Sequence, residues 1–197
     1  TEATLSVVGP DGEIVAEIPT RDARGVNRVV WNLRHTTDNQ PQGQSPRGPL
    51  VIPGEYTVRL EVGETISEQP LEVREDPRLD LDPLVRAQWT RDLLDLGELA
   101  TQASEGAESM QERLEAVEEE MGTEGDEFEQ ATDLLRQWRE LSFRTRRLQG
   151  EVEGWVGPLT QQQTSQRSFY LEMLETLRRE TGVLSAAFQK PQGGSRS

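Results

Sequence analysis

One apolar pattern in the second half of the chain restricts what this sequence can fold into. It repeats at alternating intervals of four and three residues, which is the spacing of two buried positions in a helical heptad. A helix over residues 83–121 would be roughly 58 Å long, and other helices must cover its seam. The seam residues are Trp89, Leu93, Leu96, Ala100, Ala103, Ala107, Met110, Leu114, Val117 and Met121.

Signals at the ends of this helix predict its boundaries and its neighbours. Asp82 can accept hydrogen bonds from the free N–H groups of the first turn, and Pro83 suits the first helical position. Reversals at residues 122–125 and 154–158 predict two more helices, over about 126–154 and 159–188, in an antiparallel three-helix bundle with coiled-coil packing. Their inner residues are Phe128, Ala131, Leu135, Trp138, Leu141, Thr145, Leu148, Val152 and Trp155, then Leu159, Phe169, Tyr170, Met173, Leu177, Leu184 and Phe188.

Polar residues interrupt the third helix and gather on the second. Gln162 and Gln166 occupy inward positions, so this stretch is expected to pack poorly or to face solvent. Arg144, Arg146 and Arg147 are expected to pair with acidic residues of the first helix across the seam. A solvated acidic face with such pairs is the ordinary interpretation of this charge pattern, and a docking surface for a basic partner is the alternative.

Before residue 80 the apolar residues alternate with polar ones, which is typical of half-buried strands. Strands are expected over residues 5–8, 14–18, 28–34, 56–62 and 65–73. Gly63-Glu64 predicts a tight hairpin, and Pro70 predicts an edge strand or a bulge. The fold class is therefore α+β, with an antiparallel Ig-like β-sandwich over residues 1–78, a three-helix bundle over 79–188 and a loose tail over 189–197.

Composition excludes several functions. The chain has 36 acidic and 21 basic residues and a net charge of -15, so nucleic acids and acidic lipid headgroups are poor partners. It has no cysteine, which excludes disulfides, thiolate catalysis and zinc-thiolate sites. Apolar residues make up 33% of the chain, which implies a thin core and argues against a compact enzyme. No apolar run reaches the length of a membrane span.

Catalytic and ligand-binding motifs were sought in the sequence. His35 is the single histidine, and Asp38 and Ser45 follow it without a nucleophile motif around them. Four carboxylates between Glu75 and Asp82 lack the glycine and terminal glutamate of a calcium loop, and helix capping explains them more simply. No glycine-rich phosphate loop follows a strand. We therefore expect no enzyme activity, cofactor, metal or small-molecule substrate.

Two stretches are the candidates for contact with a protein partner. The segment from His35 to Pro53 is long and rich in Gln, Gly and Pro, and the tail from Gln189 to Ser197 has nothing to bury. The candidate contact residues are His35, Asp38, Gln40, Arg47, Leu50, Lys190 and Arg196.

Short structural motifs carry a resemblance to a known family. Residues 25–34 (GVNRVVWNLR), Gly48-Pro49 and residues 53–60 (PGEYTVRL) resemble the Ig-like module of the flagellar hook-capping type. Residues 69–74, 76–78 and 158–163 extend the likeness to the C-terminal region of exported bacterial proteins with sortilin-like or BNR-repeat propellers. The resemblance implies packing positions for Trp31 and Tyr56, and it transfers no catalytic residue, because the propeller itself is absent here.

Two functional classes follow. The first is a non-catalytic, periplasmic or otherwise extracytoplasmic scaffold, an accessory subunit of a larger and membrane-anchored complex, for which a photosynthetic reaction centre is one candidate host. The second is the stabilising tail of a propeller-bearing exported hydrolase or binding protein. Several hundred residues of repeats upstream of Thr1 would favour the tail, and a short leader would favour the independent subunit.

Overall fold

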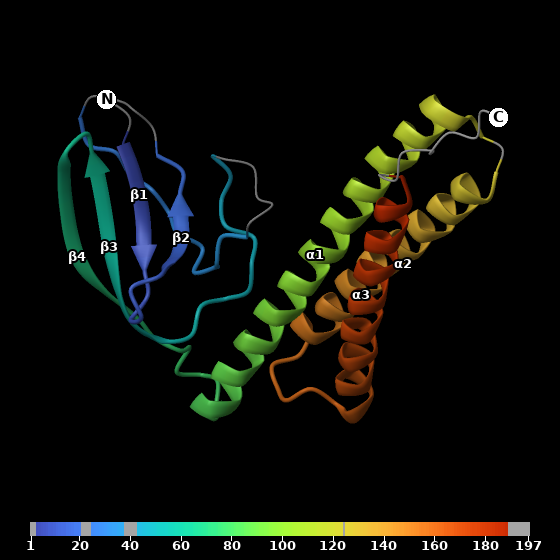
Figure 1. Cartoon of the computed structure of the whole chain (residues 1–197). Coiled ribbons are helices and arrows are strands. Elements are labelled where there is room, and N and C mark those ends of the chain that lie inside the picture. Colours follow the sequence, from blue (N-terminus) through green and yellow to red (C-terminus); the bar gives the residue numbers. More distant parts are fainter. Residues whose placement is uncertain (1–2, 21–24, 38–42, 124, 189–197) are drawn as a thin grey trace, which may run out of the picture. The chain divides into compact units, whose positions relative to one another are not determined.

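The computed structural model in Figure 1 has a four-stranded antiparallel sheet followed by three helices, so the chain is α+β. It describes residues 3–20, 25–37, 43–123 and 125–188, without the side chains of residues 120, 121 and 185–188. The chain divides into two compact units, which are treated separately below. Unit 1 comprises Thr1–Leu94 and Trp155–Pro158, and unit 2 comprises Asp95–Gly154 and Leu159–Ser197.

The sheet of unit 1 has the strand order β2-β1-β3-β4 (Figure 1). The strands are β1 (Ala3–Val8), β2 (Ile14–Ile18), β3 (Gly54–Val62) and β4 (Thr65–Val73). The predicted hairpin at Gly63-Glu64 is confirmed, since Val62 pairs with Thr65 and Gly63 adopts a φ of 58°. The predicted edge position of Pro70 is also confirmed, because β4 is the last strand of the sheet.

The core of unit 1 lies between the sheet and the long connection from β2 to β3. Val7 and Ala16 of the sheet are fully buried, and Val51 of the connection packs with them at 2% exposure. The ring of Trp31 meets Tyr56 edge-on at 6.0 Å between centroids. The packing positions that the resemblance implied for these two aromatic residues therefore fit the structure, and the connection serves as the second layer of this core.

The predicted strand over residues 28–34 does not form. Within the described part of the chain, this stretch contributes to a ladder only through one isolated bridge, between Arg34 and Leu50. Leu33 has a φ of 59°, which interrupts an extended conformation. Trp31 turns its ring into the core and donates its Nε1–H to the carbonyl of Arg34 at 3.0 Å. Val29, Trp31 and Leu33 satisfied the alternating pattern of a strand, but among the described residues no neighbouring strand pairs with them.

Arg86 is a buried cation at the start of the first helix, and it joins three parts of unit 1. Its side chain is 7% exposed and lies 3.0 Å from Glu75 Oε2, as an ion pair without an aligned hydrogen bond to that oxygen. It donates to the carbonyl of Val51 at 3.0 Å and to Thr90 Oγ1, and it covers the ring of Trp89 at 5.0 Å. Thr90 Oγ1 also reaches the carbonyl of Leu50 at 3.2 Å.

Substitution of Arg86 tests this junction. We expect Arg86→Ala to lower the free energy of unfolding of unit 1 by roughly 2–4 kcal/mol, because the Val51 carbonyl loses its buried donor and the Glu75 carboxylate loses its ion-pair partner. Urea unfolding followed by tryptophan fluorescence measures the change. Arg91→Ala is the matched control, since Arg91 is exposed on the same helix, and it should change stability by less than about 0.5 kcal/mol. Equal effects of the two substitutions would contradict the assignment.

Three helices follow the sheet: α1 (Pro83–Met121), α2 (Asp126–Glu153) and α3 (Gln161–Phe188). The predicted cap is confirmed, because Asp82 Oδ1 accepts the Leu84 N–H at 2.8 Å. Most of the predicted seam of α1 is buried, Ala107 and Leu114 are half-buried, and the side chain of Met121 lies outside the described residues. The side chain of Phe188 in α3 lies outside them as well.

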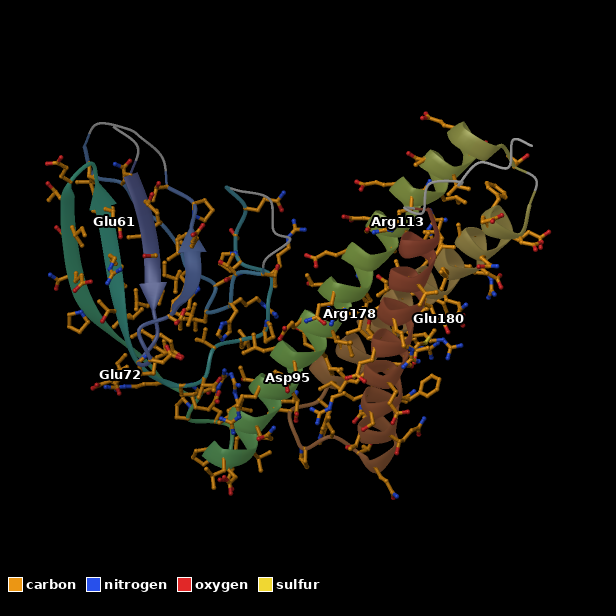
Figure 2. All side chains as sticks on the ribbon, in the orientation of Figure 1. Glu61, Glu72, Asp95, Arg113, Arg178 and Glu180 are labelled. Carbon is orange, nitrogen blue, oxygen red and sulfur yellow. The ribbon has the colours of Figure 1, made fainter. Side chains whose placement is uncertain are left out.

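Polar contacts in unit 2 link all three helices. Ser104 Oγ of α1 lies 2.9 Å from Ser142 Oγ of α2, and Trp138 of α2 donates to Thr181 Oγ1 of α3 at 3.0 Å. Arg178 of α3, labelled in Figure 2, donates to Gln102 of α1 at 3.1 Å. These contacts join each pair of the three helices within unit 2.

The expected pairing of the arginine group with acids of α1 is wrong. Arg144 pairs with Glu140 and Arg147 pairs with Glu151, so both remain on their own helix at the favourable spacing of four residues. Arg146 does cross to α1, but it donates to the hydroxyl of Ser104 at 2.6 Å. The ion pair that does join α1 to another helix links Asp95 (Figure 2) to Arg167 of α3 at 3.8 Å.

Two predicted inner aromatic residues are exposed. Trp155 is 81% exposed, because α2 ends at Glu153 and the chain turns at Gly154 before the helical stripe reaches it. Phe169 is 53% exposed, whereas its neighbour Tyr170 is buried at 6%. The sequence register of α3 placed both on the inner stripe. Tyr170 shares the buried stripe of Leu174 and Leu177, at intervals of four and three residues, and Phe169 lies beside that stripe.

Gly106 provides a test of the packing between α1 and α2. A Cβ atom at Gly106 would lie 2.4 Å from the ring of Trp138, which is itself 2% exposed. Gly106→Ala should therefore destabilise unit 2 by about 1–3 kcal/mol, despite the better helix propensity of alanine. Gly182→Ala on α3 is the matched control, since nothing lies within 4 Å of that Cβ, and it should stabilise by about 0.5–1 kcal/mol. Thermal unfolding followed by circular dichroism measures both, and stabilisation by Gly106→Ala would contradict the packing.

Candidate interaction surfaces

The predicted contact residues in the connection from β2 to β3 fall into two groups. His35 and Leu50 are half-buried, and their backbones hold the connection together: the His35 N–H donates to the Pro49 carbonyl at 2.9 Å, and Arg34 bridges Leu50. Arg47 is exposed. Asp38, Gln40, Lys190 and Arg196 lie outside the described residues.

The environment of His35 is structural. Its carbonyl accepts the Gly48 N–H at 2.8 Å, and a Cβ at Gly48 would lie 2.6 Å from that oxygen, so only glycine permits this approach. Burial lowers the pKa of His35, and the nearby Asp11 carboxylate opposes this shift. The imidazole makes no hydrogen bond with any described residue, and Ser45 is exposed. The geometry of a catalytic dyad is therefore not present at His35 among the residues described.

The first part of the same connection exposes a row of apolar side chains, whereas the sequence predicted a half-buried strand over residues 28–34. We call residues 26–33 the valine segment. Val26 is fully exposed and Val30 is 71% exposed, and Val29 and Leu33 are exposed to 38% and 42%. Isolated apolar residues on a surface are ordinary, but four within eight residues form a contiguous patch of the kind found at contact sites.

The backbone of the valine segment is unpaired over most of its length. Among the described residues, the peptide groups of Val26, Arg28, Val29 and Val30 make no hydrogen bond. Pairing begins again at Leu33, whose carbonyl accepts the Val51 N–H at 2.8 Å. The next residues then cover the outer edge of β2, where the Thr36 N–H donates to the Val15 carbonyl at 2.9 Å.

A second surface lies in unit 2, where α2 and α3 leave a shallow, open groove of about 610 Å³. Its position agrees with the prediction that Gln162 and Gln166 interrupt the packing of α3, because both residues line it. Phe143 is exposed to 68% beside the groove, and Phe169 lies on its wall. Arg144, which lines the groove, already pairs with Glu140, and Arg147 beside it pairs with Glu151.

Other kinds of site were sought in the same residues. No group of three or more metal-ligating side chains comes together within the part of the chain that the structure describes. None of the helices over its described residues is long and apolar enough to cross a membrane. Comparisons with protein-family models, with curated proteins and with solved structures found no match to the chain.

The burial of His35 predicts a pH dependence of stability. Because its folded pKa lies below 6.5, the unfolded chain binds more protons in the interval between the folded pKa and 6.5. The free energy of unfolding therefore decreases as the pH falls through that interval, because protonation of His35 favours the unfolded chain. His35→Gln should remove this part of the pH dependence, which urea unfolding between pH 4 and 8 measures. If the stability of His35→Gln depended on pH in the same way as that of the unsubstituted chain, the burial of the imidazole would be contradicted.

Proposed function

We propose that the chain is a non-catalytic protein-interaction module that acts as an accessory scaffold subunit of a larger assembly. The observation that carries this proposal is the valine segment, where exposed apolar side chains accompany the peptide groups of Val26, Arg28, Val29 and Val30, which make no hydrogen bond with the described residues. Covering such a surface with a partner is favourable, because it removes apolar area from water.

The finer fold assignment is part of the proposal. The sheet of unit 1 corresponds to one layer of an Ig-like sandwich, and the connection from β2 to β3 occupies the place of the second layer. The helices of unit 2 form an antiparallel three-helix bundle with coiled-coil packing, for which the polar links between each pair of helices are the support. In this arrangement the sheet unit presents the contact surface and the helices provide a scaffold.

The proposed location is extracytoplasmic, in the periplasm or an equivalent compartment. The absence of cysteine suits an oxidising environment, and the resemblance to exported proteins points the same way. The host complex is proposed to be membrane-bound, with the chain attached through protein contacts. Fractionation of the cell that makes the chain tests the location directly.

Co-purification tests the interaction. We expect the tagged chain, expressed in its own cell at native level, to recover a defined set of proteins by quantitative mass spectrometry. Val30→Asp should reduce that recovery by about tenfold, because it places a charge where apolar contact is expected. Val183→Asp is the matched control, since Val183 is 67% exposed on α3, and it should leave recovery unchanged. A native, monomeric chain with no protein whose recovery depends on Val30 would overturn the proposal.

A further inference from the structure

We infer that the valine segment is a site of strand addition, where an extended segment of a partner protein with alternating apolar and acidic side chains pairs with this backbone. This inference rests on the proposed function and specifies its binding mode and the chemistry of the partner. Three observations carry it: the unpaired backbone, the strand-forming sequence and the local charge.

The backbone supplies the first argument. Strand addition needs a row of N–H and C=O groups that are free to bond, and the peptide groups of Val26, Arg28, Val29 and Val30 have no partner among the described residues. The other edges of unit 1 are less suitable. Thr36 occupies the outer edge of β2, and β4 carries Pro70 together with Glu68 and Glu72, features that disfavour pairing with another chain.

The sequence supplies the second argument. Val29, Val30 and Trp31 are residue types that favour strands, yet they lie outside any strand of the sheet. An added strand would provide the cross-strand neighbours that this preference requires. The left-handed backbone of Leu33 marks where the pairable stretch ends, because a regular strand cannot continue through a φ of 59°.

Charge identifies the chemistry of the partner strand. Residues 25–36 contain Arg28, Arg34 and His35 and no acidic residue, in a chain whose net charge is -15. Arg28 is exposed. Asn32 donates a hydrogen bond to the carbonyl of Pro46 at 2.6 Å, and this bond places the exposed Arg47 in the same region. Acidic side chains opposite these guanidinium groups favour binding, and basic ones oppose it. A nucleic acid offers no apolar side chains to cover the valines, and a second copy would bring together two chains that each carry a net charge of -15.

Capped nine-residue peptides provide the probe. One alternates Val and Glu, the second alternates Val and Lys, and the third is the Val/Glu peptide with alternate amides N-methylated so that it cannot pair as a strand. We expect the Val/Glu peptide to bind the full chain about tenfold more tightly than either of the others in a fluorescence anisotropy titration. Equal binding of the methylated peptide, or tighter binding of the Val/Lys peptide, would overturn the inference.

Amide hydrogen exchange followed by NMR reads the pairing residue by residue. In the free chain, the amides of residues 26–30 should exchange rapidly. Saturation with the Val/Glu peptide should slow alternate amides by about tenfold or more, because alternate N–H groups of a strand point to the same edge. Protection of every amide, or of none, would overturn strand addition. Alternating protection in the free chain, with a dimer in sedimentation, would assign the site to a second copy and overturn the acidic partner.

Charge reversal supplies the matched variants. Arg28→Glu should exchange the preference, so that the Val/Lys peptide becomes the tighter ligand. Arg179→Glu, on the exposed face of α3, should leave the preference unchanged. If Arg179→Glu shifts the preference equally, binding follows the total charge of the chain, and the inference fails.

The outcomes separate this inference from the proposed function. Recovery of partners that depends on Val30, together with no alternating protection by the Val/Glu peptide, would leave the interaction module in place and remove strand addition. Alternating protection without any Val30-dependent partner in the cell would show that the edge is competent to pair, and would overturn the proposed function instead.

Discussion

The buried guanidinium group of Arg86 fixes the arrangement on which the rest of unit 1 depends. It donates a hydrogen bond to the carbonyl of Val51 at 3.0 Å, and the N–H of Val51 donates to the carbonyl of Leu33 at 2.8 Å. A charge with 7% exposure must have such partners, because an unpaired buried cation costs several kcal/mol. The helix start, the core residue Val51 and the end of the valine segment are therefore linked through consecutive hydrogen bonds.

Elements with strong periodic patterns were predictable from the sequence. The seam of α1 follows from its spacing because a helix buries the side chains that share one face, and the Asp82 cap and the hairpin at Gly63 follow from local backbone chemistry. Gln162 and Gln166 likewise indicated the opening between α2 and α3. These signals lie within a few residues or within one element, so they do not depend on contacts that are distant in the sequence.

The strand that does not form and the unpredicted role of Arg86 share one physical cause, which is dependence on partners that are distant in the sequence. A strand exists only when a neighbour accepts its hydrogen bonds, so the pattern of residues 28–34 could indicate a preference and could not supply the pairing. Arg86 is similar. It precedes Trp89 by three residues and so lies on the apolar stripe of α1, and an arginine there signals a buried ion pair only once Glu75 is known to be near. The predicted burial of Trp155 was wrong because α2 ends at Glu153, two residues before it.

The valine segment differs from the cores of the molecule in the exposure of its apolar side chains. Only 33% of the chain is apolar, and α1 buries most of its seam. Val26 and Val30 contribute little to the core of unit 1, because both are largely exposed. Polar replacements there would leave the described core intact, since Trp31 and Val51 supply its contacts from the connection. In the binding mode that we propose, a partner strand would cover these valines and pair with the peptide groups of Arg28, Val29 and Val30, which is a role that the core of unit 1 does not provide for them.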